Sequence, residues 1–182
     1  MRRTRVLVAV VLSLVLVGAW VLCVEWPVDE PPTATGESSR AGNRPVRLED
    51  GRRVLVRFTD QGLVERHQSA EGRPWSRPKV LYARSGDPEC PVRLSTYRNT
   101  VTVVAHYYGS GCYAESEAET VVVAVSDGDL GDWDRHLSAG WLDWKEPRYS
   151  WSGLRVVFRQ GEDALSWRQT IGFTGATDGP PD

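Results

Sequence analysis

The chain has 182 residues, a length typical of one folded domain with appendages, and 41% of them are hydrophobic, with eight tryptophans, which is enough for a core. Its formal charge is −2, and without Arg2, Arg3 and Arg5 the remaining 19 basic residues face 24 acidic ones, a balance of −5. Nucleic acids are bound by basic surfaces. The composition therefore argues against a nucleic-acid partner.

The first 24 residues have the pattern of a membrane anchor. An apolar run from residue 6 to residue 24, interrupted only by Ser13 and Gly18, follows the three arginines. At about 1.5 Å per residue the run would be roughly 28 Å long as a helix, close to the hydrocarbon thickness of a bilayer. Because arginines stay on the cytoplasmic side, we expect a single-pass signal-anchor over residues 1–24, embedded through residues 6–24, with the rest of the chain extracytoplasmic.

Two other interpretations of this segment remain open. The small residues around Gly18 and Ala19 offer a cleavage site, which would make the segment a signal peptide and the protein secreted. Lipoprotein processing at Cys23 is less favoured, because Leu22 stands where that processing requires a small residue. In each case the remainder of the chain lies outside the cytoplasm.

Residues 25–45 contain four prolines among Thr, Ser, Glu and Gly, with almost no apolar periodicity. Such a segment buries too little surface to offset its ordering entropy, so we expect a flexible linker. Residues 174–182 have a similar composition and are expected to be a disordered tail. The folded domain is therefore expected over residues 46–173.

This folded part contains one pattern three times, over residues 54–82, 101–137 and 154–171. Each copy runs strand, turn, strand and Trp within a unit of about 45 to 55 residues, the size of a four-stranded propeller blade. β-Branched residues dominate and no helical periodicity follows Val24, so we expect an all-β antiparallel domain. The expected strands are Val54–Phe58, Val101–Ala105, Val121–Val125 and Arg155–Phe158, with Val56, Val103, Val123 and Val157 buried.

The apolar run at residues 121–125 leads into an acidic turn that ends at Trp133, which predicts a hairpin. The turn resembles the Asp-box of sialidase-like β-propellers, Ser/Thr-x-Asp-x-Gly-x-x-Trp. Asp129 and Gly131 match its core, whereas Asp127 stands where Ser/Thr belongs and Trp133 comes one residue early. In that family the box is structural: its side chains bond the turn backbone and its Trp packs into the blade. The resemblance therefore implies propeller blades and no catalytic residue.

Three such units are fewer than the four to eight blades that close a propeller. An incomplete propeller or open array, a small sandwich or barrel, and closure by oligomerisation all remain open.

Cys90 and Cys112 flank the expected strand at residues 101–105, in turns rich in Gly and Pro. In an oxidising compartment we expect them to form a disulfide, which would close a loop of about 22 residues and contribute about 3 kcal/mol. Cys23 belongs to the anchor and is expected to stay out of it. Two free thiols are the alternative. No His or Cys stands at metal-ligand spacing, so we expect no metal and no cofactor.

Catalysis of the sialidase type would need an arginine cluster, a Tyr–Glu pair and an acidic Asp. The early Arg-Ile-Pro motif of that family is absent, and the three histidines are isolated, so no catalytic residue is assigned. The acidic turn begins like a calcium loop, but Ser138 occupies the position of the closing Glu. An Asp/Gly hairpin turn is the favoured interpretation.

An aromatic cluster offers the candidate ligand contacts, although the same rings would also suit a core that is poor in Leu and Ile. The candidates are Trp141, Trp144, Tyr149, Trp151, Tyr107 and Tyr108. The sequence thus predicts a non-catalytic, membrane-tethered extracytoplasmic β module that binds a glycan or a protein. The alternative is a small sialidase-like glycan-processing domain.

Overall fold

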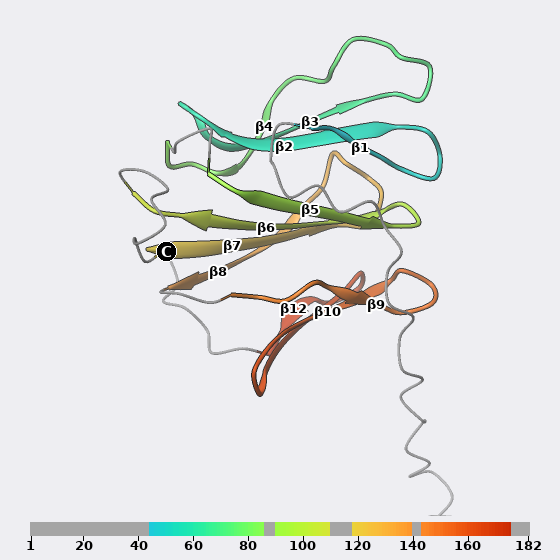
Figure 1. The fold of residues 1–182 in the computed structure, drawn as a ribbon. Helices are drawn as coiled ribbons and strands as arrows, with labels where there is room; N and C mark the ends of the chain where they lie inside the picture. The colour runs from blue at the N-terminus through green and yellow to red at the C-terminus, as the bar shows by residue number, and fades with distance from the viewer. Residues whose placement is uncertain (1–43, 86–89, 110–117, 140–142, 176–182) are drawn as a thin grey trace, which may run out of the picture. The chain divides into compact units, whose positions relative to one another are not determined.

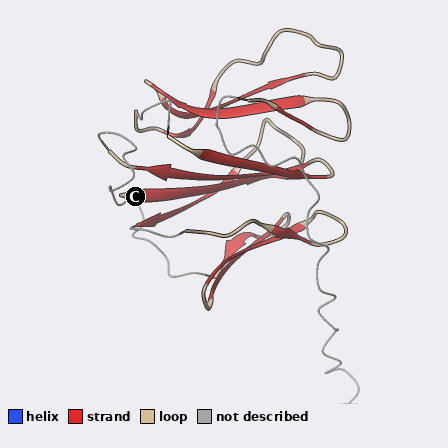
Figure 2. Cartoon of the chain, viewed as in Figure 1, coloured by secondary structure: helices blue, strands red, loops and turns tan. Residues whose placement is uncertain are grey.

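The computed structural model describes residues 44–85, 90–109, 118–139 and 143–175. These residues form β-strands joined by turns and loops, and no helix occurs among them (Figure 2). Within the same ranges no helix is long and apolar enough to cross a membrane. The expected anchor, residues 25–43 of the expected linker and residues 176–182 of the expected tail lie outside the described residues, whereas Thr174, expected in the tail, is the last residue of a strand.

Three antiparallel four-stranded sheets follow one another along the chain (Figure 1). The first contains β1 (Val46–Arg47), β2 (Arg53–Thr59), β3 (Gly62–Gln68) and β4 (Lys79–Tyr82). The second contains β5 (Val92–Tyr97), β6 (Thr100–Tyr107), β7 (Thr120–Ser126) and β8 (Asp134–Ala139). The third contains β9 (Arg148–Tyr149), β10 (Arg155–Gln160), β11 (Asp163–Arg168) and β12 (Gly172–Thr174). Each sheet is a meander, and the described residues form no closed propeller.

All four expected strands lie within observed ones: β2, β6, β7 and β10. Val56, Val103 and Val123 are buried as expected. Val157 is a correction, because it is half-buried whereas its neighbours Val156 and Phe158 are fully buried. Side chains alternate between the two faces of a strand, so an error of one residue in phase moves the predicted core position to the opposite face.

The core consists of two clusters, one on each face of the second sheet. On β7, Val122 and Ala124 pack with residues of the first sheet, whereas Val121, Val123 and Val125 pack with residues of the third. A strand covered on both faces needs no polar alternation. This double burial explains the uninterrupted apolar run at residues 121–125.

Candidate functional site

The acidic turn between β7 and β8 is held by its own side chains. Ser126 Oγ donates to the Asp129 carbonyl at 2.7 Å, and Asp129 Oδ1 accepts from the Gly131 backbone N–H at 3.0 Å. The Trp133 indole N–H donates to the Leu130 carbonyl at 3.0 Å, and both side chains are buried against the first sheet. The Asp129 carboxylate thus stabilises the hairpin, and its geometry is that of a structural turn.

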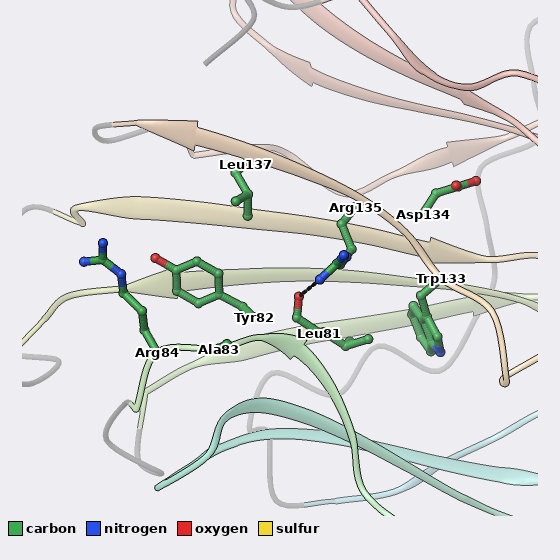
Figure 3. Close-up of a pocket in the computed structure, with 8 residues that line it drawn as sticks. All are labelled: Leu81, Tyr82, Ala83, Arg84, Trp133, Asp134, Arg135 and Leu137. Carbon is green, nitrogen blue, oxygen red and sulfur yellow. Dashed lines mark hydrogen bonds between the residues drawn. The ribbon is translucent and has the colours of Figure 1, made fainter. Parts of the chain in front are cut away.

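Beside this turn, a pocket of about 570 Å³ lies between the edge strands of the first and second sheets, β4 and β8 (Figure 3). Register explains which side chains enter it. Arg135 pairs with Ala124 and Leu137 pairs with Val122, so both lie on the face of β8 directed toward the first sheet. The residues that line the pocket are Leu81, Tyr82, Ala83, Arg84, Trp133, Asp134, Arg135 and Leu137.

Two guanidinium groups dominate the polar part of this pocket. Arg135 Nη1 donates to the Leu81 carbonyl at 3.1 Å and so ties β8 to β4, while Arg84 is exposed. Neither arginine forms an ion pair with any described residue. The Tyr82 hydroxyl lies 3.4 Å from Thr120 Oγ1 and is too far for a strong hydrogen bond. The pocket therefore offers cationic and phenolic donors whose hydrogen-bonding capacity is largely unused by the residues that the structure describes.

Asp134 is the carboxylate among the lining residues, and it is already engaged. Its Oδ2 accepts from the indole N–H of Trp167 in the third sheet at 2.6 Å. In Figure 3 its side chain points away from Tyr82 and Arg84. The pocket is consequently electropositive, with an apolar wall formed by Leu81, Leu137 and the ring of Trp133.

A buried carboxyl group lies on β3. Glu65 is fully buried, its Oε1 is 2.9 Å from His67 Nδ1, and its Oε2 has no hydrogen-bond partner among the described residues. Burial raises the pKa of the Glu65 carboxyl, while the hydrogen bond from His67 and the charge of Lys79 oppose that rise. Lys79, opposite Glu65 on β4, donates to the Gly131 carbonyl and links this group to the acidic turn.

Sequence reasoning did not single out Glu65, Arg84 or Arg135. For Glu65 a signal existed, because it shares the inward face of β3 with Leu63. An acid on the apolar face of a strand predicts a buried charge. For the pocket no comparable signal exists, because Arg84 and Arg135 are 51 positions apart and only the packing of two sheets brings them together.

The six aromatic candidates do not form one surface. Trp144 and Tyr149 have no exposed surface and belong to the core between the second and third sheets, which corrects their assignment as ligand contacts. Tyr107 is also buried, and Tyr108 is half-buried. Trp151 is 73% exposed, and Trp141 lies outside the described residues. Aromatic rings fill this core because the third sheet contributes few Leu or Ile side chains to it.

Two further expectations concern the cysteines and metals. Cys90 is buried just before β5, but Cys112 lies outside the described residues, so their disulfide stays a prediction. Within the described ranges no three His, Cys, Asp or Glu side chains gather as a metal-ligand set.

Comparison with known proteins adds no relative. No family model, curated protein or solved structure matches the chain.

Proposed function

We propose that this chain is a non-catalytic, membrane-tethered extracytoplasmic binding module whose ligand enters the pocket between β4 and β8. The observation that carries the proposal is the pair Arg84 and Arg135, which face an open pocket and have no ion-pair partner among the described residues. Arginine forks bind carboxylate, sulfate or phosphate oxygens with directional, charge-assisted hydrogen bonds.

The ligand that fits best is a small acidic unit of a glycan. The pocket volume of about 570 Å³ falls within the range of small-molecule sites, roughly 300–1,000 Å³, and is small for a protein interface. The acidic group would bind the two guanidinium groups, and the apolar face of the same unit would pack on Leu137, which is half-buried. An Asp or Glu side chain of a partner protein would bind the same two guanidinium groups, with further contacts outside the pocket.

The sialidase-like resemblance supports the architecture of this proposal. Three four-stranded meanders match the expected blade size, and the turn with Asp129 bonds its own backbone and buries its Trp, as an Asp-box does.

Glycan processing is the weaker candidate because the residues that line the pocket do not provide the carboxyl groups that such catalysis needs. Glycoside hydrolysis commonly needs two carboxyl groups across the substrate, and the sialidase type needs a tyrosine supported by a glutamate. Among the lining residues Asp134 is bonded to Trp167, and the nearest polar partner of Tyr82 is the hydroxyl of Thr120. A binding role needs neither acid–base pair.

Binding of the full-length chain, purified in detergent, to an array of acidic glycans and their neutral counterparts tests the proposal. We expect acidic glycans to bind, and Arg84→Gln to weaken them at least tenfold, because one charge-assisted hydrogen bond contributes about 1.5–3 kcal/mol. Arg57→Gln, on the outer face of the first sheet, is the matched control and should bind as the wild type does. Equal binding of neutral and acidic glycans, or cleavage of any of them, would contradict the proposal.

A further inference from the structure

One end of the third sheet exposes three large apolar side chains. Trp151 and Leu154 lie in the turn between β9 and β10 and are 73% and 46% exposed. Ile171 lies in the turn between β11 and β12 and is 62% exposed. The backbone N–H of Gln169 donates to the Leu154 carbonyl at 3.2 Å, so the two turns are adjacent. We call these three side chains, together with Arg98, Arg155 and Arg168 beside them, the tip.

Three arginines lie in or next to the turns that carry the apolar side chains of the tip. Arg155 and Arg168 are directly opposite each other at the end of β10 and β11 that adjoins both turns. Like charges in such a cross-strand pair repel, and neither arginine has an ion-pair partner among the described residues. Arg98, in the turn between β5 and β6, places its guanidinium 4.6 Å from the ring centroid of Trp151. The Arg98 guanidinium thus contacts the Trp151 ring, while Arg155, which is half-buried, and Arg168, which is exposed, lie at the strand ends next to both turns.

The acidic residues of the third sheet lie away from the tip. Glu162, in the hairpin turn between β10 and β11, and Asp163, the first residue of β11, lie at the opposite end of these two strands. Glu146 precedes β9 on the side that continues toward that same end. Asp127 of the neighbouring turn accepts a hydrogen bond from Gln169 and bounds the tip on one side. The charged neighbours of the exposed apolar side chains are therefore arginines, with two acids of the second sheet, Asp127 and Asp134, on the side of Gln169 and Gly172.

The turn that carries Trp151 is rigidly built. Ser150 Oγ accepts from the Arg155 backbone N–H at 3.2 Å, and the Gly153 N–H donates to the Ser150 carbonyl at 2.9 Å. Thr100 Oγ1 donates to the Gly153 carbonyl at 2.9 Å and anchors the turn to the second sheet. Gly153 has a φ of +79°, which favours glycine at this position. A fixed turn that holds a tryptophan in solvent points to a surface the ring contacts in the assembled protein.

We propose that the tip inserts into the headgroup layer of the bilayer to which the chain is tethered. Tryptophan favours that layer, aliphatic side chains reach the acyl boundary, and arginines extend to lipid phosphates. The inference rests on the anchor expected over residues 6–24. Only about 19 residues separate that anchor from residue 44, a span of at most roughly 65 Å when fully extended. The tether therefore holds the domain at the membrane, and the tip supplies a second contact that orients it.

Quenching of tryptophan fluorescence by brominated lipid tests the insertion. The full chain is reconstituted into vesicles of phosphatidylcholine and phosphatidylglycerol, with bromine on the upper part of the acyl chains. Because Trp20 and Trp26 lie at and just beyond the end of the expected anchor, the measured quantity is the difference between the wild type and Trp151→Phe. We expect the substitution to remove a clear part of the quenching, and the pair Leu154→Ser with Ile171→Ser to reduce it as well.

Val80→Ser is the matched control, since Val80 is an exposed apolar residue of the first sheet, at 39%, and its loss should leave quenching unchanged. Identical quenching of the wild type and Trp151→Phe would overturn the proposal. So would a chain that fails to incorporate into vesicles, because the tether would then be absent. Shielding of Trp151 from acrylamide at rising protein concentration in detergent, without bromine quenching, would indicate a second copy on the tip and would also overturn it.

Discussion

The second and third sheets are the same four-stranded meander in different surroundings. β6 and β7 of the second sheet are buried on both faces, and their side chains are almost uniformly apolar or small. On β10 of the third sheet only one face is covered: Val156 and Phe158 on that face are buried in the core, whereas Arg155 and Arg159 lie on the opposite face. The difference shows that the number of covered faces, more than the strand pattern, decides where this protein can carry charge and ligand contacts.

The largest expected effect is the difference in stability between substitutions on the covered face and on the outer face of β10. Phe158→Ala removes a fully buried ring and should lower the free energy of unfolding by about 3–5 kcal/mol, through lost transfer energy and a cavity. Val157→Ala, its half-buried neighbour, should cost under about 1 kcal/mol. Chemical denaturation of both variants measures the contrast. Similar losses would mean that the outer face of the third sheet is also covered.

The expected disulfide would add a covalent constraint to the second sheet that the third lacks. Cys90→Ser should lower stability by about 2–4 kcal/mol by releasing a loop of about 22 residues. Cys112→Ser should cost a similar amount, and the double substitution little more than either single one, because one bond is lost in all three. Denaturation curves and alkylation of the unreduced protein measure this. Full additivity with two alkylatable thiols would contradict the pairing.

The two interfaces of the second sheet also differ in buried polar chemistry. The interface with the third sheet holds a neutral pair, Tyr149 with Thr102 at 2.7 Å, and burial raises the pKa of that tyrosine further above its ordinary value. The interface with the first sheet holds Glu65, with His67 and Lys79 as its charged neighbours. Of these groups the Glu65 carboxyl has its ordinary pKa, 4.5, in the acidic range, and burial raises that pKa.

Glu65→Gln should therefore change how stability depends on pH. Because the pKa of the Glu65 carboxyl is raised in the folded state, its favourable contribution is complete below its ordinary value of 4.5 and is lost as the pH rises through the folded pKa. The Gln variant lacks this loss, so its melting temperature should exceed that of the wild type by a few degrees at pH 7.5 and by less at pH 4.5. Glu162→Gln, in an exposed turn, is the control. A difference independent of pH would refute the role assigned to the buried carboxyl.

Local sequence determined the strands and the acidic hairpin. A short β-branched run such as residues 121–125, followed at once by a polar turn, is typical of a strand buried on both faces, and a turn of Asp and Gly can satisfy its own backbone. The size of the repeat likewise indicated four strands in each unit. These features depend on neighbours in the chain, so the pattern of residues was sufficient to predict them.

The tertiary structure decided which residues face outward and which come together. The prediction of a buried Val157 was wrong in phase, because Val157 shares its face of β10 with Arg155 and Arg159, and the packing against the second sheet buries Val156 and Phe158. The same packing buried Trp144 and Tyr149 and left Trp151 in solvent. Arg84 and Arg135 share a pocket because two edge strands from different sheets approach each other. Burial and proximity of this kind arise from contacts between distant segments, which no window of the sequence contains.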